Sequence, residues 1–226
     1  MLAEKLKITL DKAGIHYAWV MASIVFLFTL ATSTITSAPQ ILILPITEAN
    51  GWDISDVSIA TGLMYFMTAI LCPIGAPLML RIGVINVVLI VIFLEVIGLL
   101  CTVLAFEKWH LLVSIGLCLG IASGIIGLGL SATVATRWFT ARRGLVVGIM
   151  TSAFAAGQLI FMPLMAWITT VSNWQFAIAP GLIGGIICGS LFFLVGKDWP
   201  SQLNLAPYGE DKIYYPPKEN TGNAIS

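Results

Sequence analysis

Hydroxyl and amide side chains recur at helical spacing within the first apolar run of this sequence. Measured from the first of them, the others follow at offsets of 3, 4, 7 and 11, so all lie on one helical face. A polar face inside a membrane should meet protein or a watery cavity, because lipid offers no hydrogen bonds. We therefore expect a cavity wall, with hydroxyls bonded only to their own helix backbone as the alternative. The residues are Thr29, Thr32, Ser33, Thr36 and Gln40.

A weaker version of this pattern occurs in the fifth apolar run, where Thr151 and Gln158 are seven positions apart. The amide of Gln158 could hydrogen-bond a carboxylate or hydroxyl of a ligand, or it could bridge two helices. Both interpretations remain open at this stage.

One carboxylate, Glu95, lies near the middle of the third apolar run. An acidic group at that depth costs a few kcal/mol to insert, so it should be paired, protonated or functional. Proton coupling is one hypothesis, and a protonated Glu hydrogen-bonded to a neighbouring helix is the other.

The residue types that catalysis would need do not come together. The stretch around Ser131 faintly resembles a membrane serine protease, but a serine nucleophile needs a base. The only two histidines, His16 and His110, precede the first and fourth apolar runs. We find no phosphate loop, dinucleotide fingerprint, metal-ligand pair or basic run typical of nucleic-acid binding. The sequence predicts no enzyme, no cofactor and no metal site.

The elements that must position these side chains are membrane-spanning helices. The 226 residues are 58% hydrophobic and 10% charged, against roughly 25% charged in soluble domains. Such a chain cannot cover a water-facing surface, so we expect an integral membrane protein that contacts the lipid bilayer. About 20 apolar residues are needed for each span. Six continuous runs meet this length, at residues 17–39 (continuing to about 46), 57–80, 84–105, 111–135, 145–171 and 176–195.

Basic residues predict the orientation of these six spans. Ten of the eleven Lys and Arg residues fall on one side, and Lys108 stands alone on the other. The positive-inside rule then places both termini in the cytoplasm. Four arginines in the two short loops on that side are candidates for setting topology and for gating. They are Arg81, Arg137, Arg142 and Arg143.

The sequence divides into three regions by composition. Residues 1–16 form a cytoplasmic N-terminal segment, and residues 17–196 form the six-span bundle. Residues 197–226 are polar and rich in proline, which predicts a linker-like and largely disordered tail.

Four motifs resemble the N-terminal half of the major facilitator superfamily, in particular its monocarboxylate transporter and oxalate:formate antiporter branch. They are HYAWVMASIVFLF at the first span, GAPLMLRIG after the second, RWFTARRGLVVGIMTSAFAAGQ between the fourth and fifth, and KDWPSQLNLAPYGED after the sixth. In this family twelve helices form two halves around a substrate at the midplane. The resemblance covers about residues 14–211, and Leu80 stands where the general signature has an Asp.

The resemblance implies that spans 1, 2, 4 and 5 face a central cavity, with Tyr65 among its residues, and that spans 3 and 6 are peripheral. It also implies secondary transport of a small organic anion by alternating access across a bacterial inner membrane, with or without a coupled proton. The partner would be a C-terminal six-helix half or a second copy of the chain. The alternative is a non-transporting truncated remnant or a membrane assembly protein.

Overall fold

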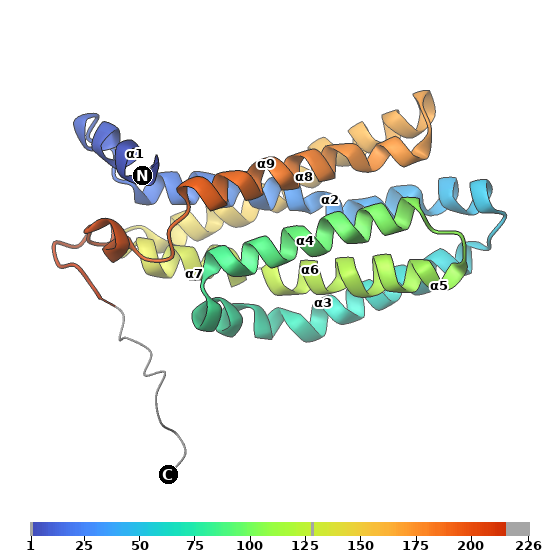
Figure 1. The fold of residues 1–226 in the computed structure, drawn as a ribbon, viewed down its shortest axis with the longest axis horizontal. Coiled ribbons are helices and arrows are strands. Elements are labelled where there is room, and N and C mark those ends of the chain that lie inside the picture. The colour runs from blue at the N-terminus through green and yellow to red at the C-terminus, as the bar shows by residue number, and fades with distance from the viewer. Residues whose placement is uncertain (1, 128, 216–226) are drawn as a thin grey trace, which may run out of the picture.

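The chain forms a bundle of membrane-length helices that run along one common axis (Figure 1). The computed structural model describes residues 2–127 and 129–215, and within these residues it contains helices and no strand. Six segments are long and apolar enough to cross a membrane, which confirms the predicted all-α fold with six spans. These spans are α2 (Ala18–Asn50), α3 (Ile54–Ile82), α4 (Val84–Val103), Lys108–Trp138, α8 (Arg143–Val171) and Trp174–Val195.

The first span is longer than the apolar run that predicts it. Helix α2 continues through Pro39 and Pro45 to Asn50, and the capping residue Gly51 adopts a left-handed conformation with φ of 66°. The Gly51 N–H donates to Thr47 O, which satisfies one of the last carbonyls of the helix. The two prolines therefore do not break the span.

The fourth predicted span, residues 111–135, lies within the span Lys108–Trp138, which is not one regular helix. It consists of α5 (Lys108–Leu111), the π-helix η1 (Leu112–Leu119), α6 (Gly120–Ile126) and α7 (Gly129–Trp138). The Gly127 N–H donates to Ser123 O and caps α6. Glycine is a poor helix former, and it lets α6 approach α3 closely. A Cβ on Gly124, for example, would lie 3.0 Å from the Cα of Thr68.

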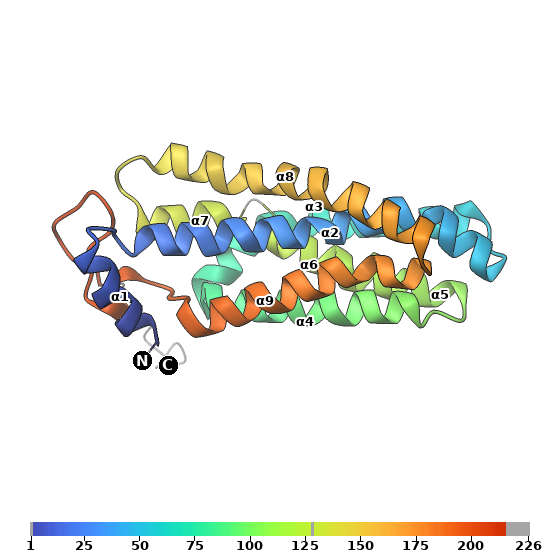
Figure 2. The same cartoon turned by 90° about the horizontal axis from the view of Figure 1, so that it is seen from above.

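Packing divides the spans into two groups that meet where α4 packs against α9 and where α2 packs against α3. Helix α2 contacts mainly α8 and α9, whereas α3 contacts mainly α6 and η1. Helix α4 packs against η1 and α9. Helix α9 comprises Ala179–Val195 and follows the short 3-10 helix η2 (Trp174–Ile178). Figure 2 shows α2 beside α8 and α4 beside α9.

The two ends of the bundle differ in charge. At one end lie α1 (Leu2–Lys12), the α3–α4 turn, the α7–α8 loop and the segment after α9 (Figure 1). We call this the basic end, because the four loop arginines lie there. At the opposite end, Lys108 Nζ lies 2.6 Å from Asp56 Oδ2, so the one basic residue expected there is paired with an acid.

Part of the C-terminal segment is packed against the bundle, which differs from the disorder expected over residues 197–226. Residues 197–215 include the 3-10 helix η3 (Pro200–Leu203), and Tyr208 pairs with the α7–α8 loop. The Tyr208 N–H donates to Trp138 O at 2.8 Å, and the Thr140 and Ala141 N–H groups donate to Tyr208 O. These backbone bonds order a polar sequence that could not form a core by itself. Residues 216–226 lie outside the described residues.

Candidate functional site

A cavity of about 260 Å³ lies beside the middle of α2 and collects side chains from four spans. Helices α2, α3, α6, α7 and α8 contribute to its wall, whereas α4 and α9 contribute none of its residues. Apart from Cys72 and Gly127, the wall is made of hydroxyl-bearing and apolar side chains, and it includes no charged group. The hydroxyl-bearing residues are Thr29, Thr32, Thr36, Thr68, Ser123, Ser131 and Thr151.

Three hydroxyls of the wall, two on α2 and one on α8, line the cavity and also bond to their own helices. Thr32 donates to Phe28 O at 3.0 Å, Thr36 to Ser33 O at 2.9 Å, and Thr151 to Val147 O at 2.9 Å. With each proton bonded to the backbone, the oxygen lone pairs remain free to accept hydrogen bonds. The two interpretations of this polar face are therefore compatible.

Thr29 differs from its neighbours on the same wall. Its residue is 6% exposed, and its Oγ1 has no hydrogen-bond partner among residues 2–127 and 129–215. A buried hydroxyl without a partner costs about 1–3 kcal/mol. This atom can donate to or accept from a polar solute in the cavity.

The remaining polar residues predicted for the pathway lie outside this wall. Ser33 is fully buried in the α2–α8 contact, where its side chain lies against Gly157. The Gln158 Nε2 donates to Thr36 Oγ1 at 3.4 Å, so this amide bridges α8 and α2. The Gln40 Nε2 donates to Tyr65 OH at 2.7 Å, and this pair is exposed between α2 and α3.

Several wall residues were not singled out by sequence reasoning. Thr68 Oγ1 and Ser123 Oγ lie 2.5 Å apart and join α3 to α6, and Thr68 also contacts Gly120 O. Ser131 was considered only as a nucleophile, yet it lines the cavity. Each is an isolated polar residue in an apolar run, so no periodic pattern marked it.

Glu95 lies away from the cavity, between α4 and α9. It is fully buried, and neither of its carboxylate oxygens has a hydrogen-bond partner in the described part of the chain. A Cβ on Gly185 would lie 3.0 Å from Glu95 Oε2, so the glycine of α9 makes room for the carboxyl group. An ionised carboxylate is costly in such surroundings, which favours the neutral acid.

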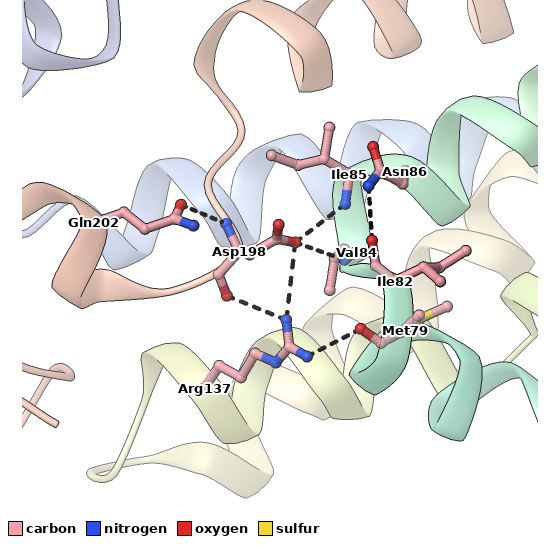
Figure 3. Close-up of polar contacts among 8 residues, drawn as sticks. All are labelled: Met79, Ile82, Val84, Ile85, Asn86, Arg137, Asp198 and Gln202. Carbon is pink, nitrogen blue, oxygen red and sulfur yellow. Dashed lines mark hydrogen bonds and ion pairs between the residues drawn. The ribbon is translucent and has the colours of Figure 1, made fainter. Parts of the chain in front are cut away.

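At the basic end, Arg137 is buried and joins three parts of the chain (Figure 3). Its Nη2 donates to Met79 O at the end of α3, at 3.0 Å, and its Nη1 donates to Asp198 O at 3.3 Å. Its guanidinium also stacks over Trp199, 4.5 Å from the ring centroid. Arg137 was predicted as a topology or gating residue, and the structure gives it the contacts of a structural link.

The second member of this link, Asp198, was missed in the sequence. Its Oδ1 lies 3.8 Å from Arg137 Nη1 and accepts hydrogen bonds from Val84 N and Ile85 N, at 2.5 Å and 3.2 Å. A carboxylate at the N-terminus of α4 satisfies free N–H groups and complements the helix dipole. In the sequence, the only feature that marks Asp198 is its position directly after the sixth span.

Comparison with known proteins identifies the family of this bundle. The model of the Major Facilitator Superfamily matches residues 18–212, which is most of the chain. The chain belongs to the Major Facilitator Superfamily. It is also similar to an "MFS-type transporter" of Gibberella zeae, with 26% identity over 102 residues that make up 45% of this chain. The match spans only 22% of the relative's length.

Within this facilitator bundle, the remaining loop arginines are exposed. Arg81 makes no hydrogen bond or ion pair among the described residues, and Leu80 beside it is 63% exposed. Arg142 begins the turn into α8 with φ of 59°. The Arg143 Nε donates to Phe139 O at 3.1 Å, which leaves the outer edge of its guanidinium without a protein partner among residues 2–127 and 129–215.

An aromatic cluster joins the facilitator bundle to its C-terminal segment. Tyr208 packs against His16, Trp19 and Phe139, with ring centroids 5.7 to 5.8 Å apart. The His16 Nδ1 accepts the N–H of Ala18 and so caps the start of α2. Burial lowers the pKa of His16, and a backbone hydrogen bond to Ala206 opposes this shift.

Proposed function

We propose that this chain is one six-helix half of a secondary transporter that moves a small organic anion by alternating access. The observation that supports it most is the hydroxyl-lined cavity between spans 1, 2, 4 and 5, near the middle of α2. Substrates of facilitators bind near the midplane, between two halves. The family match supports membrane transport in general.

The charge of the cavity decides what a partner must supply. The described wall has no cationic side chain, and most of its hydroxyls have oxygen lone pairs to offer rather than protons. Acceptors of this kind suit the hydroxyl or N–H groups of a solute. Charge complementarity to a carboxylate would therefore come from the other half, either a C-terminal six-helix half or a second copy of the chain.

The exposed polar pair Gln40–Tyr65 also favours a partner. A neutral amide and a phenol at the surface of two spans would be costly against lipid. Contact with a second half, or with the water-filled pathway between halves, would remove that cost. We propose that both termini face the cytoplasm, as the positive-inside rule indicates for the basic end, in an inner membrane.

Glu95 is a candidate for the coupled proton only through an indirect route. It lies on α4 and faces α9, and neither helix contributes a residue to the described cavity wall. A change in its protonation would act on the packing of α4 against α9, with Gly185 opposite its carboxyl group.

Uptake into proteoliposomes tests the proposal. The chain alone and the chain co-reconstituted with a C-terminal six-helix half would be compared with radiolabelled small carboxylates and with neutral polyols. Saturable carboxylate uptake supports the proposal, and its restriction to the co-reconstituted sample identifies the partner as the second half. Saturable uptake of polyols alone would overturn the anion assignment. No uptake in either sample would favour a non-transporting remnant or assembly protein.

A further inference from the structure

A second cavity lies at the basic end and shares no wall residue with the hydroxyl-lined cavity. Its volume is about 520 Å³, and it lies between the ends of α3 and α7, the start of α8 and the segment after α9. We propose that this cavity binds the headgroup of a zwitterionic phospholipid, one that carries a phosphate and an ammonium group.

Two opposite charges line this cavity without contacting each other. Arg143 and Glu210 both belong to its wall, yet among the described residues they form no ion pair with each other. Arg143 uses only Nε within the protein, so the outer edge of its guanidinium can bind a phosphate through two nitrogens. Glu210 makes no side-chain hydrogen bond in the described residues and can pair with an ammonium group. One ligand with both charges satisfies both residues.

The other charged residue of the wall is already neutralised. Arg137 donates to two carbonyls, stacks on Trp199 and lies next to Asp198. The free charges of the wall are therefore one positive and one negative. A purely anionic headgroup would face the Glu210 carboxylate without compensation, so the balance of charge favours a zwitterion.

Two further hydroxyls are available near the proposed phosphate. Thr133 and Thr140 line the cavity, and their side-chain oxygens make no hydrogen bond with the described residues. Thr136, between them on α7, instead bonds to Ala132 O at 2.7 Å. Hydroxyl donors beside an arginine are a common arrangement for a phosphate group.

The apolar part of the wall points to a lipid rather than a soluble phosphate. Ala76 and Leu80 at the end of α3 and Ala132 on α7 form it, and Leu80 is 63% exposed. Tyr214 lines the same cavity and is 55% exposed. Exposed Leu and Tyr next to basic residues at the end of a span are typical of the interface between lipid tails and headgroups. An acyl chain could pass along the small residues of α3 and α7.

Lipid binding by the purified full chain tests this proposal. Thermal unfolding in detergent would be followed while phosphatidylethanolamine, phosphatidylcholine or phosphatidylglycerol is added, and bound lipid would be counted by native mass spectrometry. The wild type should prefer phosphatidylethanolamine over phosphatidylglycerol by roughly two- to fivefold, the size expected for one partly exposed ion pair. Equal binding of all three lipids would overturn the proposal.

Two substitutions test the role of each charged residue separately. Glu210→Gln should abolish or reverse the preference for phosphatidylethanolamine over phosphatidylglycerol, whereas Arg143→Gln should weaken binding of all three lipids. Arg142→Asn is the matched control, because Asn tolerates the φ of 59° and removes an exposed positive charge outside the wall. An equal effect of Arg142→Asn and Arg143→Gln would show nonspecific attraction and overturn the site.

A last measurement compares stabilisation of the chain by soluble phosphoethanolamine with stabilisation by the lipid. If phosphoethanolamine stabilises the chain as strongly as the lipid, the occupant is a soluble zwitterion and the lipid assignment is wrong. If Arg143→Gln fails to fold, Glu210→Gln still decides the proposal, because the Glu210 side chain is exposed and makes no hydrogen bond or ion pair with the described residues. The measurement is lipid binding, so its failure leaves the proposed transport function untouched.

Discussion

Asp198 lies 3.8 Å from Arg137 and caps the first two N–H groups of α4, so one carboxylate joins the segment after α9 to α4 and α7. Asp198→Ala should lower the free energy of unfolding by about 1–2 kcal/mol, because it removes the cap and leaves Arg137 without its counter-ion. Asp198→Asn should cost less, since its amide oxygen can still cap α4. Thermal unfolding in detergent measures both. Equal loss in the two variants would show that the ion pair, and not the cap, matters.

The contact between α2 and α8 depends on the absence of a side chain at Gly157. A Cβ there would collide with Ser33 Oγ and Leu30 O, so Gly157→Ala should destabilise the bundle by about 1–3 kcal/mol. Gly148→Ala on the same helix is the control. A Cβ at Gly148 meets nothing within 4 Å, so this variant should be neutral or slightly stabilising. Similar unfolding temperatures for the two variants would contradict the close packing at Gly157.

The hydroxyl wall should matter for uptake more than for stability. Thr36→Val in the assembled transporter removes an oxygen that lines the cavity and accepts from Gln158. We expect uptake to fall by about five- to tenfold, as for the loss of one hydrogen bond to a solute, with unchanged membrane abundance. Thr169→Val, an exposed position on α8 whose hydroxyl bonds to its own helix, is the control. Reduced abundance of Thr36→Val alone would indicate a structural role.

The docking of the C-terminal segment should weaken in acid. Burial disfavours the charged imidazole ring and so holds the pKa of His16 in the folded chain below its ordinary value of 6.5. For a base with a lowered pKa, the stabilisation is fully present above about pH 6.5 and is lost as the pH falls below it. Protonation at Nδ1 also removes the acceptor that caps α2. Proteolytic cleavage near Tyr208 should therefore become faster below pH 6.5.

A substitution that keeps the hydrogen-bond acceptor at the start of α2 but cannot be protonated tests whether His16 causes the acid sensitivity. His16→Asn offers an oxygen acceptor at the same position, so its cleavage rate should be independent of pH over this range. The same acid sensitivity in His16→Asn would assign the effect to another group.

Glu95 should tolerate an amide in its place. Because the buried carboxyl group has no partner in the described residues, Glu95→Gln should leave the unfolding temperature and abundance nearly unchanged. Glu95→Lys would place a larger charge against α9 and should prevent stable insertion. Loss of uptake in a stable Glu95→Gln protein would favour the proton hypothesis, and normal uptake would exclude it.

The positions of the spans could be predicted from the sequence because each needs a continuous apolar run of fixed length, which is a local property. The grouping of the basic residues at one end could also be predicted from the sequence, because successive loops lie at alternating ends of the bundle. The four-residue spacing of Gly120 and Gly124 is typical of close helix packing, and the structure shows that the partner is α3. The end of α6 at Gly127, inside the fourth span, is not marked in the sequence, because it depends on how α6 and α7 fit against α3.

What the sequence alone determined is therefore the all-α membrane bundle, its family motifs and the face of α2 that carries Thr29, Thr32 and Thr36. Only the tertiary structure separated the hydroxyls of the cavity from Ser33 and Gln158, which lie between helices, because neighbours on one helical face can meet different partners. It also placed Asp198 at the start of α4, 114 positions away from Val84 in the chain. Such contacts depend on how separate helices pack, and the apolar pattern of one segment carries no information about the side chains of another.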